Sequence, residues 1–482
     1  MNTRADMAAH RTKDAEREHG YDIAVIGAGS AGFSAAITAA EQGARVALIG
    51  HGTIGGTCVN VGCVPSKTMI RAAAALYGAR AASRFPGLAA QAQVTAWRDL
   101  VAAKDDLVAS LRQKKYVDLL SGYDGITYLQ GRARLDGPGV LVNGDALHAD
   151  RIIITAGARA ARPDIVGIES VAALDSTSAL ELTGLPGSLL VIGAGYIGCE
   201  LAQMFARVGV QVTLVSRRGI LPDAEPEIAA ALSGYFTDEG IRVVCGISYR
   251  RIERDAAGVV LVVERDGHEE RLVAERVLVA TGRTPNTEDL GLDEAGVARD
   301  ASGAIEVDDR MRTTRPGIYA AGDVTGRDQF VYMAAHGAKL AARNALNGDR
   351  LIYDNAAMPA VVFTDPQVAS VGLTQAQARL AHHEIRTSVL SLEHVPRALA
   401  ARDTRGLIKL IADARTQRLL GAHILAPEGA DSIQSAVLAI RHGMSVQDLG
   451  ATIFPYLTTV EGLKLAAQAF DKDVESLSCC AG

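Results

Sequence analysis

The chain has 482 residues, a length that suggests about three domains at roughly 150 residues each. Hydrophobic residues make up 48% of it and charged residues 22%, which excludes a disordered protein and a solenoid of charged helices. No apolar run approaches the roughly 20 residues of a membrane helix, and the net charge of −6 argues against binding to nucleic acid or anionic membranes.

The N-terminal residues and the cysteines indicate a reducing compartment. Residues 1–20 lack the apolar core of a secretion signal, and their acidic residues argue against a transit peptide. We therefore expect a solvated tail and a cytoplasmic protein. Six cysteines are too few for a disulfide scaffold, and in the cytoplasm a close pair is more often catalytic or metal-binding than structural.

A dinucleotide-binding turn is predicted at the start of the folded chain. Residues 21–26 are a short apolar strand, a Gly-x-Gly-x-x-Gly turn follows, and an Ala-rich helical run comes next. The glycines allow a tight turn, close approach of a pyrophosphate, and packing of helix on strand, while the helix N-terminus favours phosphate. The residues assigned to this turn are Gly27, Gly29, Ser30, Ala31 and Gly32.

The same pattern recurs at residues 189–198, and similar closing strands follow the two copies at residues 152–157 and 277–282. The recurrence predicts an internal duplication of a dinucleotide-binding module. Two nucleotide sites favour a flavin with a nicotinamide. The glycines of the second turn are Gly193, Gly195 and Gly198.

The residues after the second strand of each module set the recognition of the ribose. In the second module the strand ends in Ser216, Arg217 and Arg218, without a carboxylate for a ribose diol. Two guanidinium groups suit a 2′-phosphate, so NADPH is favoured over NADH; the alternative is that the arginines only solvate a loop. In the first module the strand ends at Gly50, where an acidic residue would be expected.

The remaining strands complete the outline. Residues 317–323 predict a strand that ends in a small-residue turn and Asp323, which can bind a ribitol or phosphate or simply cap a helix. From about Leu351 short strands alternate with amphipathic helices, an arrangement that in two-nucleotide proteins commonly dimerises. The strands predicted there are residues 360–364, 406–411 and 419–425.

Two cysteines separated by four residues are the most informative feature. Cys58 and Cys63 lie in the segment 55–67, just after the second strand of the first module, so they should lie beside the first nucleotide. A zinc site needs two further ligands, and no nearby Cys or His offers them. We therefore predict a redox pair close to a flavin. Cys199 and Cys245 are expected to be packing residues.

On these motifs the chain resembles the pyridine nucleotide–disulfide oxidoreductases from about Tyr21 to the C-terminus. The resemblance implies an α/β fold with two Rossmann-like dinucleotide-binding domains, as in glutathione reductase, and an α+β C-terminal dimerisation domain. The implied parts are a tail (1–20), an FAD domain (21–160), an NADPH domain (161–283), a central domain completing the FAD site (284–350) and the interface domain of a homodimer (351–482).

The resemblance also implies roles for individual side chains. Cys63 matches the thiol that contacts the flavin, and Cys58 matches the interchange thiol that meets the substrate. Lys67 matches a lysine near the flavin N5 whose carboxylate partner is matched by Glu200. Tyr196 matches the aromatic residue that covers the flavin until nicotinamide displaces it.

The cofactor contacts that we assign are more numerous than these. Besides the glycine turn, the FAD contacts are Gly55, Gly56, Thr57, Lys67, Ala133, Thr155, Gly157 and Asp323. The NADPH contacts beyond the second glycine turn are Tyr196, Ile197, Ser216, Arg217, Arg218, Gly282 and Arg283.

The C-terminal stretch indicates which class of substrate the protein reduces. Family members that act on ordinary disulfides carry His-Pro-Thr followed by a glutamate. The histidine transfers a proton to the thiolate that leaves. Here Tyr456 takes the histidine's place while Glu461 is retained. A phenol with a pKa of about 10 is a poor proton shuttle at neutral pH, so disulfide substrates are disfavoured.

The chain ends with the adjacent thiols of Cys479 and Cys480. Adjacent cysteines rarely form a strain-free disulfide, and two thiolates suit a soft, two-coordinate metal ion. Within the family these features resemble the members that reduce mercuric ions. The resemblance implies that a Hg(II)–thiol complex is captured by this pair from the partner subunit, passed to Cys58 and Cys63, and reduced to Hg(0) with NADPH through FAD.

By the same resemblance, Tyr456 and Tyr116 hold the metal near Cys58. We expect no N-terminal metal-binding domain with a CxxC motif, which some relatives carry. Two alternatives stay open: an NADPH-dependent reductase of a low-molecular-weight disulfide, and a non-catalytic protein that sequesters metal on its thiols. The second alternative leaves two nucleotide modules without a purpose.

Overall fold

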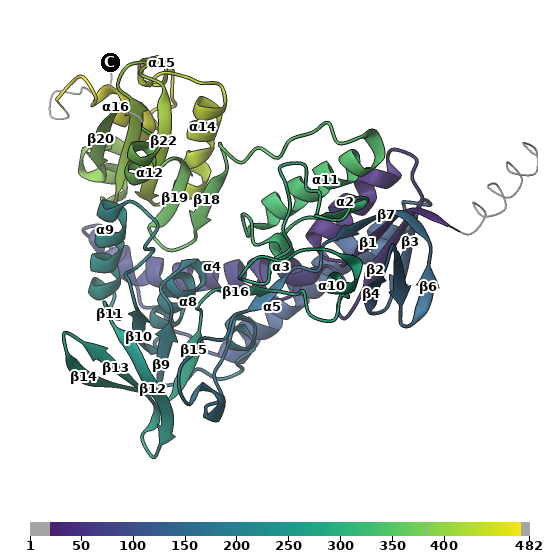
Figure 1. Cartoon of the computed structure of the whole chain (residues 1–482). Helices are drawn as coiled ribbons and strands as arrows, with labels where there is room; N and C mark the ends of the chain where they lie inside the picture. Colours follow the sequence, from purple (N-terminus) through teal and green to yellow (C-terminus); the bar gives the residue numbers. More distant parts are fainter. Residues whose placement is uncertain (1–19, 383, 474–482) are drawn as a thin grey trace, which may run out of the picture. The chain divides into compact units, whose positions relative to one another are not determined.

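The computed structural model describes residues 20–382 and 384–473 (Figure 1). The expected N-terminal tail and the Cys479–Cys480 pair therefore lie outside the described residues. Contacts divide the chain into two units. Among the described residues, the first unit comprises 20–65, 103–160 and 283–354, and the second comprises 66–102, 161–282, 355–382 and 384–473. No helix of the described ranges is long and apolar enough to cross a membrane.

The first unit is built on a parallel five-stranded sheet in the order β17-β7-β1-β2-β3. Its central strands are almost continuously apolar and buried, as strands covered on both faces must be. The predicted strand, glycine turn, helix and closing strand are all present. The strands are β1 (Tyr21–Ile26), β2 (Val46–Gly50), β3 (Ile126–Gln130), β7 (Ala149–Ile154) and β17 (Ile318–Ala320).

Helix α2 (Ser30–Ala40) follows the first turn and packs against α11 (Val331–Asn347). Two small antiparallel sheets complete the unit, with strand orders β4-β5-β6 and β16-β8. Their strands are β4 (Ala133–Asp136), β5 (Gly139–Val142), β6 (Asp145–Leu147), β8 (Ala158–Ala160) and β16 (Arg283–Pro285). The further helices are α3 (Gly56–Asn60), α6 (Asp118–Leu120) and α10 (Leu292–Ala295), with α4 (Cys63–Arg80) and α5 (Trp97–Arg112) continuing across the division of the chain.

The second unit repeats the module, with a parallel sheet in the order β11-β10-β9-β15, so the predicted duplication is present. An antiparallel sheet, β12-β13-β14, is inserted before its last strand. The strands are β9 (Ser188–Ile192), β10 (Gln211–Ser216), β11 (Arg242–Cys245), β12 (Ser248–Asp255), β13 (Gly258–Arg265), β14 (His268–Ala274) and β15 (Arg276–Val279). The helices are α7 (Ser176–Leu180), α8 (Tyr196–Arg207) and α9 (Pro226–Asp238).

Residues 66–102 belong to the second unit, which the sequence did not anticipate. Met69 and Trp97 are buried in one apolar cluster with Phe205 of α8. The indole Nε1 of Trp97 also donates a 2.7 Å hydrogen bond to the carbonyl oxygen of Leu182. The five consecutive segments proposed from the sequence stay a prediction.

The C-terminal part of the second unit is an antiparallel five-stranded sheet in the order β18-β19-β22-β21-β20. The three predicted strands correspond to β18, β21 and β22, whereas β19 and β20 were not predicted. The strands are β18 (Pro359–Val362), β19 (Gln367–Gly372), β20 (Ile385–Ser391), β21 (Leu407–Asp413) and β22 (Leu419–Ala426). The helices are α12 (Gln375–Leu380), α13 (Pro396–Ala401), α14 (Gly429–Arg441), α15 (Val446–Ala451) and α16 (Glu461–Gln468).

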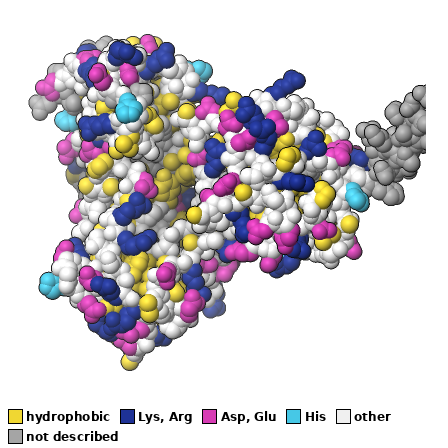
Figure 2. All heavy atoms as spheres, in the orientation of Figure 1, with side chains coloured by type: hydrophobic (Ala, Val, Ile, Leu, Met, Phe, Trp, Pro, Cys, Tyr) yellow, Lys and Arg dark blue, Asp and Glu magenta, His cyan; other side chains and the backbone are white. Residues whose placement is uncertain are grey.

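Charges of both signs are interspersed over the face drawn in Figure 2, with no gathering of Lys and Arg there. This distribution agrees with the small net charge, because a polyanion-binding surface would collect one sign on one face.

The glycines of the second turn are a steric requirement of the fold. A Cβ on Gly193, whose φ is +106°, would lie 2.4 Å from the carbonyl oxygen of Ala280. A Cβ on Gly198 would lie 1.8 Å from the carbonyl oxygen of Gly193. By contrast, a Cβ on Gly195 would meet nothing within 4 Å, so the space that a pyrophosphate needs is open at that residue.

Gly198→Ala should therefore destabilise the protein, by about 1–3 kcal/mol for overpacking, because helix α8 must shift away from the turn. Gly234→Ala is the matched control: this exposed glycine lies inside α9, where a Cβ would meet nothing within 4 Å. It should stabilise by about 0.5–1 kcal/mol. Melting temperatures followed by circular dichroism check both changes, and equal temperatures for the two variants would contradict the steric account.

Candidate functional site

The segment that carries the two thiols is attached directly to the first nucleotide turn. The backbone N–H of Gly55 donates a 2.9 Å hydrogen bond to the carbonyl oxygen of Ala28, and Gly55 and Gly29 form an isolated parallel bridge. A Cβ on Gly56, whose φ is +67°, would lie 2.5 Å from the Cα of Gly29. Only glycine allows the two backbones to approach this closely.

Cys58 lies in α3, and Cys63 is the first residue of α4; both are half-buried. Asn60 braces the loop between them, because its Nδ2 donates hydrogen bonds of 2.9 Å to two backbone carbonyls at the start of the segment. Arg112 of α5 in turn donates a 3.1 Å hydrogen bond to Asn60 Oδ1. The thiols are therefore held by a fixed loop.

Tyr116 packs against the segment that carries the thiols, since a Cβ on Gly55 would lie 3.2 Å from its ring. Burial raises the pKa of its phenol, a hydrogen bond with Ser30 at 3.2 Å lowers it, and the nearby charges of Cys58 and Cys63 raise it. Tyr116 belongs to η2 (Gln113–Val117), a π-helical turn between α5 and α6, and such turns frequently occur at functional sites. The resemblance had placed this tyrosine near Cys58, but no local pattern of the sequence indicates it.

The first glycine turn fits the pyrophosphate of FAD. Gly27 has a φ of +117°, and a Cβ on Gly32 would lie 1.7 Å from its carbonyl oxygen. No side chain caps the N-terminus of α2 at Gly29, so the N–H groups there are available to an anion. Thr155, also assigned to FAD, donates to the carbonyl oxygens of Ile26 and Gly27 at 3.0 and 3.1 Å.

Arg283 and Asp323 form an ion pair within the first unit, with 3.4 Å between Nε and Oδ2. Burial raises the pKa of the Asp323 carboxyl, and the guanidinium opposes this shift. Arg283 also donates to the carbonyl oxygen of Ala158. The sequence assigned Arg283 to NADPH and Asp323 to FAD; the structure brings the two together, while the neighbouring Gly282 belongs to the second unit.

Three further residues assigned to FAD lie in the first unit, whereas Lys67 belongs to the second. Ala133 opens β4 and is half-buried, and Gly157 follows β7 with a φ of +71°. Thr57 lies in α3 between the glycine pair and Cys58.

Lys67 and Glu200 form the pair that the resemblance implied, across 133 positions of sequence. Lys67 Nζ lies 2.7 Å from Glu200 Oε2, and the Glu200 side chain is only 5% exposed. The other carboxylate oxygen accepts a 2.9 Å hydrogen bond from the backbone N–H of Phe363. Lys67 follows Cys63 by one turn of α4, so one helix carries a thiol and this cation.

The second glycine turn leaves α8 uncapped by side chains, and Tyr196 is the first residue of that helix with 41% of its surface exposed. Ile197 follows it. Ser216 ends β10, and its Oγ donates a 3.0 Å hydrogen bond to the carbonyl oxygen of Gly219. This bond closes a tight turn, and the two residues between Ser216 and Gly219 are Arg217 and Arg218.

Arg217 and Arg218 are both exposed. Arg218 lies 3.2 Å from Asp223, a carboxylate that the sequence interpretation missed because it follows the strand by several residues. The two side chains are 69% and 85% exposed, and such a surface pair is weak. It leaves Arg218 available for a phosphate.

Tyr456 and Glu461 occupy different environments. Tyr456 is 51% exposed, next to the exposed Ile453 and Leu457. Glu461 opens α16, is buried, and accepts a 3.3 Å hydrogen bond from the backbone N–H of Leu457. The glutamate therefore stabilises the loop that presents the tyrosine.

Cys199 is buried and donates a 3.4 Å hydrogen bond to the carbonyl oxygen of Ala194. Burial also raises the pKa of both Cys199 and Cys245, which keeps them as thiols. The predicted packing role of Cys199 is confirmed. In the part of the chain that the structure describes, no three His, Cys, Asp or Glu side chains could together hold a metal ion.

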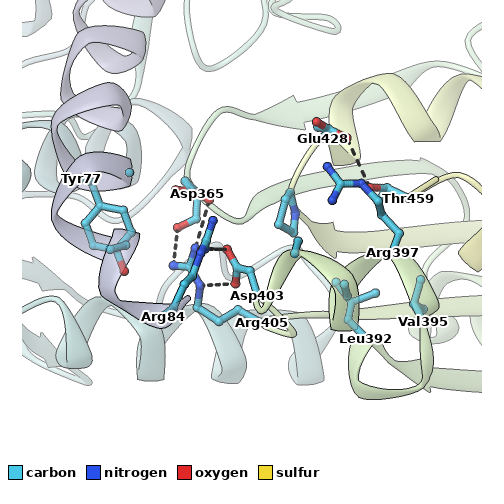
Figure 3. A pocket seen from close by; sticks show the side chains of 15 residues that line it. Tyr77, Arg84, Asp365, Leu392, Val395, Arg397, Asp403, Arg405, Glu428 and Thr459 are labelled. Atoms are coloured by element: carbon cyan, nitrogen blue, oxygen red, sulfur yellow. Dashed lines mark hydrogen bonds and ion pairs between the residues drawn. The ribbon is translucent and has the colours of Figure 1, made fainter. Parts of the chain in front are cut away.

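A cavity of about 240 Å³ in the second unit is separate from the predicted site residues (Figure 3). Arg405 lies in its wall and bonds Asp403 at 2.8 and 2.9 Å and Asp365 at 3.3 Å. Arg84 lies 3.1 Å from Asp403, and the ring of Tyr77 faces Arg405. No local pattern in the sequence indicates this network, because its members come from distant segments.

Glu200→Ala should destabilise the protein by about 1–3 kcal/mol, because the backbone N–H of Phe363 and the Lys67 ammonium both lose their acceptor. Glu200→Gln keeps an oxygen that can accept one of the two hydrogen bonds, so its loss should be smaller. Thermal unfolding of both purified variants checks this order. A Glu200→Ala protein as stable as Glu200→Gln would show that the pair is not a structural support.

The comparisons with known proteins agree with this geometry. A family model described as pyridine nucleotide-disulphide oxidoreductase matches residues 21–342, and the dimerisation domain of that family matches residues 358–467. A mercuric reductase of Staphylococcus aureus is 44% identical over 471 residues, covering 97% of this chain and 86% of that protein. A mercuric reductase of Streptomyces lividans is 46% identical over 469 residues, covering 96% of this chain and 99% of that protein.

Among solved structures, the Cu(II) complex of the HOCl-induced flavoprotein disulfide reductase RclA from Escherichia coli superimposes with a TM-score of 0.83. It is 31% identical, and the match covers 93% of this chain and 99% of that one. The fold and the two nucleotide modules are therefore shared with a flavoprotein.

Proposed function

The chain belongs to the pyridine nucleotide-disulphide oxidoreductase family, and from this membership we propose that it is an FAD-dependent homodimer that reduces Hg(II) to Hg(0) with NADPH. The observation that carries the proposal is the place of Tyr116, which lies 3.2 Å from Ser30 of the first glycine turn and packs against Gly55 of the segment that carries Cys58 and Cys63. Two thiols and a phenol suit the capture of a soft cation. They do not suit proton transfer to a leaving thiolate, which the histidine of disulfide-reducing relatives performs.

The reaction balances as NADPH + Hg(II) → NADP⁺ + Hg(0) + H⁺. Bound FAD supplies the two-electron transfer between the nicotinamide and the thiol pair. We assign its pyrophosphate to the first glycine turn and that of NADPH to the second. Glu200 holds the Lys67 ammonium on the helix that begins with Cys63.

We propose that two pairs of thiols bind the Hg(II) substrate in turn. We assign the first capture of a Hg(II)–thiol complex to Cys479 and Cys480 of the partner subunit, and the second to Cys58 and Cys63, with Tyr116 and Tyr456 holding the ion. Each new sulfur–mercury bond forms as an old one breaks, so the ion is never released. Hg(0) binds thiolates poorly and leaves, which makes the reaction a detoxification, and we place it in the cytoplasm.

A second candidate is the NADPH-dependent reduction of a low-molecular-weight disulfide, which the likeness to a flavoprotein disulfide reductase favours. NADPH oxidation by the flavin-loaded protein should be compared with a Hg(II)–thiol complex, oxidised glutathione and lipoamide as acceptors. We expect a mercury-dependent rate and little disulfide turnover. Robust disulfide turnover without a mercury-dependent rate would establish the second candidate instead.

Replacing both Arg217 and Arg218 with Ala should raise the KM for NADPH tenfold or more, because two charge-assisted phosphate contacts of about 1.5–3 kcal/mol each are lost. The KM for NADH should change little. Asp223→Asn is the matched control: it removes only the partner of Arg218, so NADPH should bind equally well or more tightly. Equal losses with NADPH and NADH would show that the arginines do not recognise the phosphate.

Changing both Cys479 and Cys480 to Ala should leave the reduction of the inner pair by NADPH intact. Turnover of Hg(II) should fall steeply when the ion arrives bound to glutathione, because we assign the first exchange of such a bulky complex to this pair. Small mercuric halides should still be reduced. Steady-state rates with the two forms of Hg(II) measure this difference, and Cys58→Ala should abolish both rates. Full activity of the double variant on the glutathione complex would remove the capture role.

A further inference from the structure

Ser30 contacts Tyr116 as well as belonging to the first nucleotide turn. It is the first residue of α2, and its Oγ lies 3.2 Å from the phenol oxygen of Tyr116, 86 positions away in sequence. The sequence assigned Ser30 to the FAD site only. A hydroxyl at the start of α2 therefore faces a phenol whose ring packs against Gly55, in the segment that carries both thiols of the redox pair.

The ring of Tyr116 is held on more than one side. Phe33 of α2 packs edge-on against it, with 4.9 Å between the ring centroids and an interplanar angle of 84°. Gly55 lies so close that a Cβ there would be 3.2 Å from the ring. Packing of this kind fixes the ring but leaves the hydroxyl proton free to rotate.

The hydrogen bond to Ser30 restricts that rotation. When the phenol donates its proton to Ser30 Oγ, the lone pairs of the phenol oxygen are left for another partner. In the half-buried surroundings of Tyr116 such a bond is stronger than it would be in water.

We propose that Ser30 is a positioning residue for the metal step: its hydroxyl accepts the Tyr116 proton and directs the phenol oxygen toward the ion held by Cys58 and Cys63. This inference rests on the proposed reduction of Hg(II). It adds a direct link from the first nucleotide turn to the metal-holding phenol, so that the turn that binds the cofactor also orders the substrate site.

A double-mutant cycle tests the link. Mercury-dependent NADPH oxidation is measured per bound flavin for the unmodified protein, Ser30→Ala, Tyr116→Phe and the double variant. We expect Ser30→Ala to lower kcat/KM for Hg(II) about fivefold to tenfold, as loss of one hydrogen bond predicts. In the Tyr116→Phe background the same change should cause no further loss. Ser30→Thr keeps the hydroxyl and should restore most of the activity.

Binding of Hg(II) without NADPH gives a second readout. Competition between the protein and a chelating dithiol for Hg(II), measured with the tail cysteines replaced by Ala, should show weaker retention in Ser30→Ala than in Ser30→Thr. Equal losses in both Tyr116 backgrounds would overturn the proposal, because Ser30 would then act through the cofactor alone. Absence of any mercury-dependent rate in the unmodified protein would instead contradict the proposed function.

Discussion

The close backbone approach between Gly56 and Gly29 is the constraint on which the rest of the site depends. Because Gly56 has no Cβ, the segment that carries Cys58 can lie against the turn that begins the first nucleotide module. The turn must be glycine-rich to admit a pyrophosphate, and the same lack of side chains admits the thiol segment. Cofactor binding and placement of the redox pair therefore share one steric requirement.

Lys67 and Tyr116 differ in charge, and this difference gives them different roles near the thiol pair. The Lys67 ammonium is kept in place by a buried carboxylate, so a fixed positive charge follows Cys63 along α4. Burial holds the pKa of Tyr116 above its ordinary value, so its phenol stays protonated at neutral pH and loses its proton only in more alkaline solution. A group of this kind exchanges no proton with a leaving thiolate near pH 7, but its oxygen can still contact a cation.

Local patterns in the sequence predicted much of this arrangement. Both glycine turns, their strands and helices, and the position of the thiols after the first module have short-range patterns, and the structure contains the predicted elements. Contacts between distant segments were not predictable in this way. Ser30 with Tyr116, Arg218 with Asp223, and the joining of residues 66–102 to the second core depend on tertiary packing, which leaves no period in the sequence.

Mercury vapour measured against NADPH consumed tests the central claim most directly. The flavin-loaded homodimer, supplied with NADPH and the glutathione complex of Hg(II), should release one Hg(0) for each NADPH oxidised, and Cys58→Ala should release none. Oxidation of NADPH without Hg(0), or undiminished vapour from the Cys58→Ala protein, would contradict the assignment of the inner thiol pair as the place where the metal is reduced.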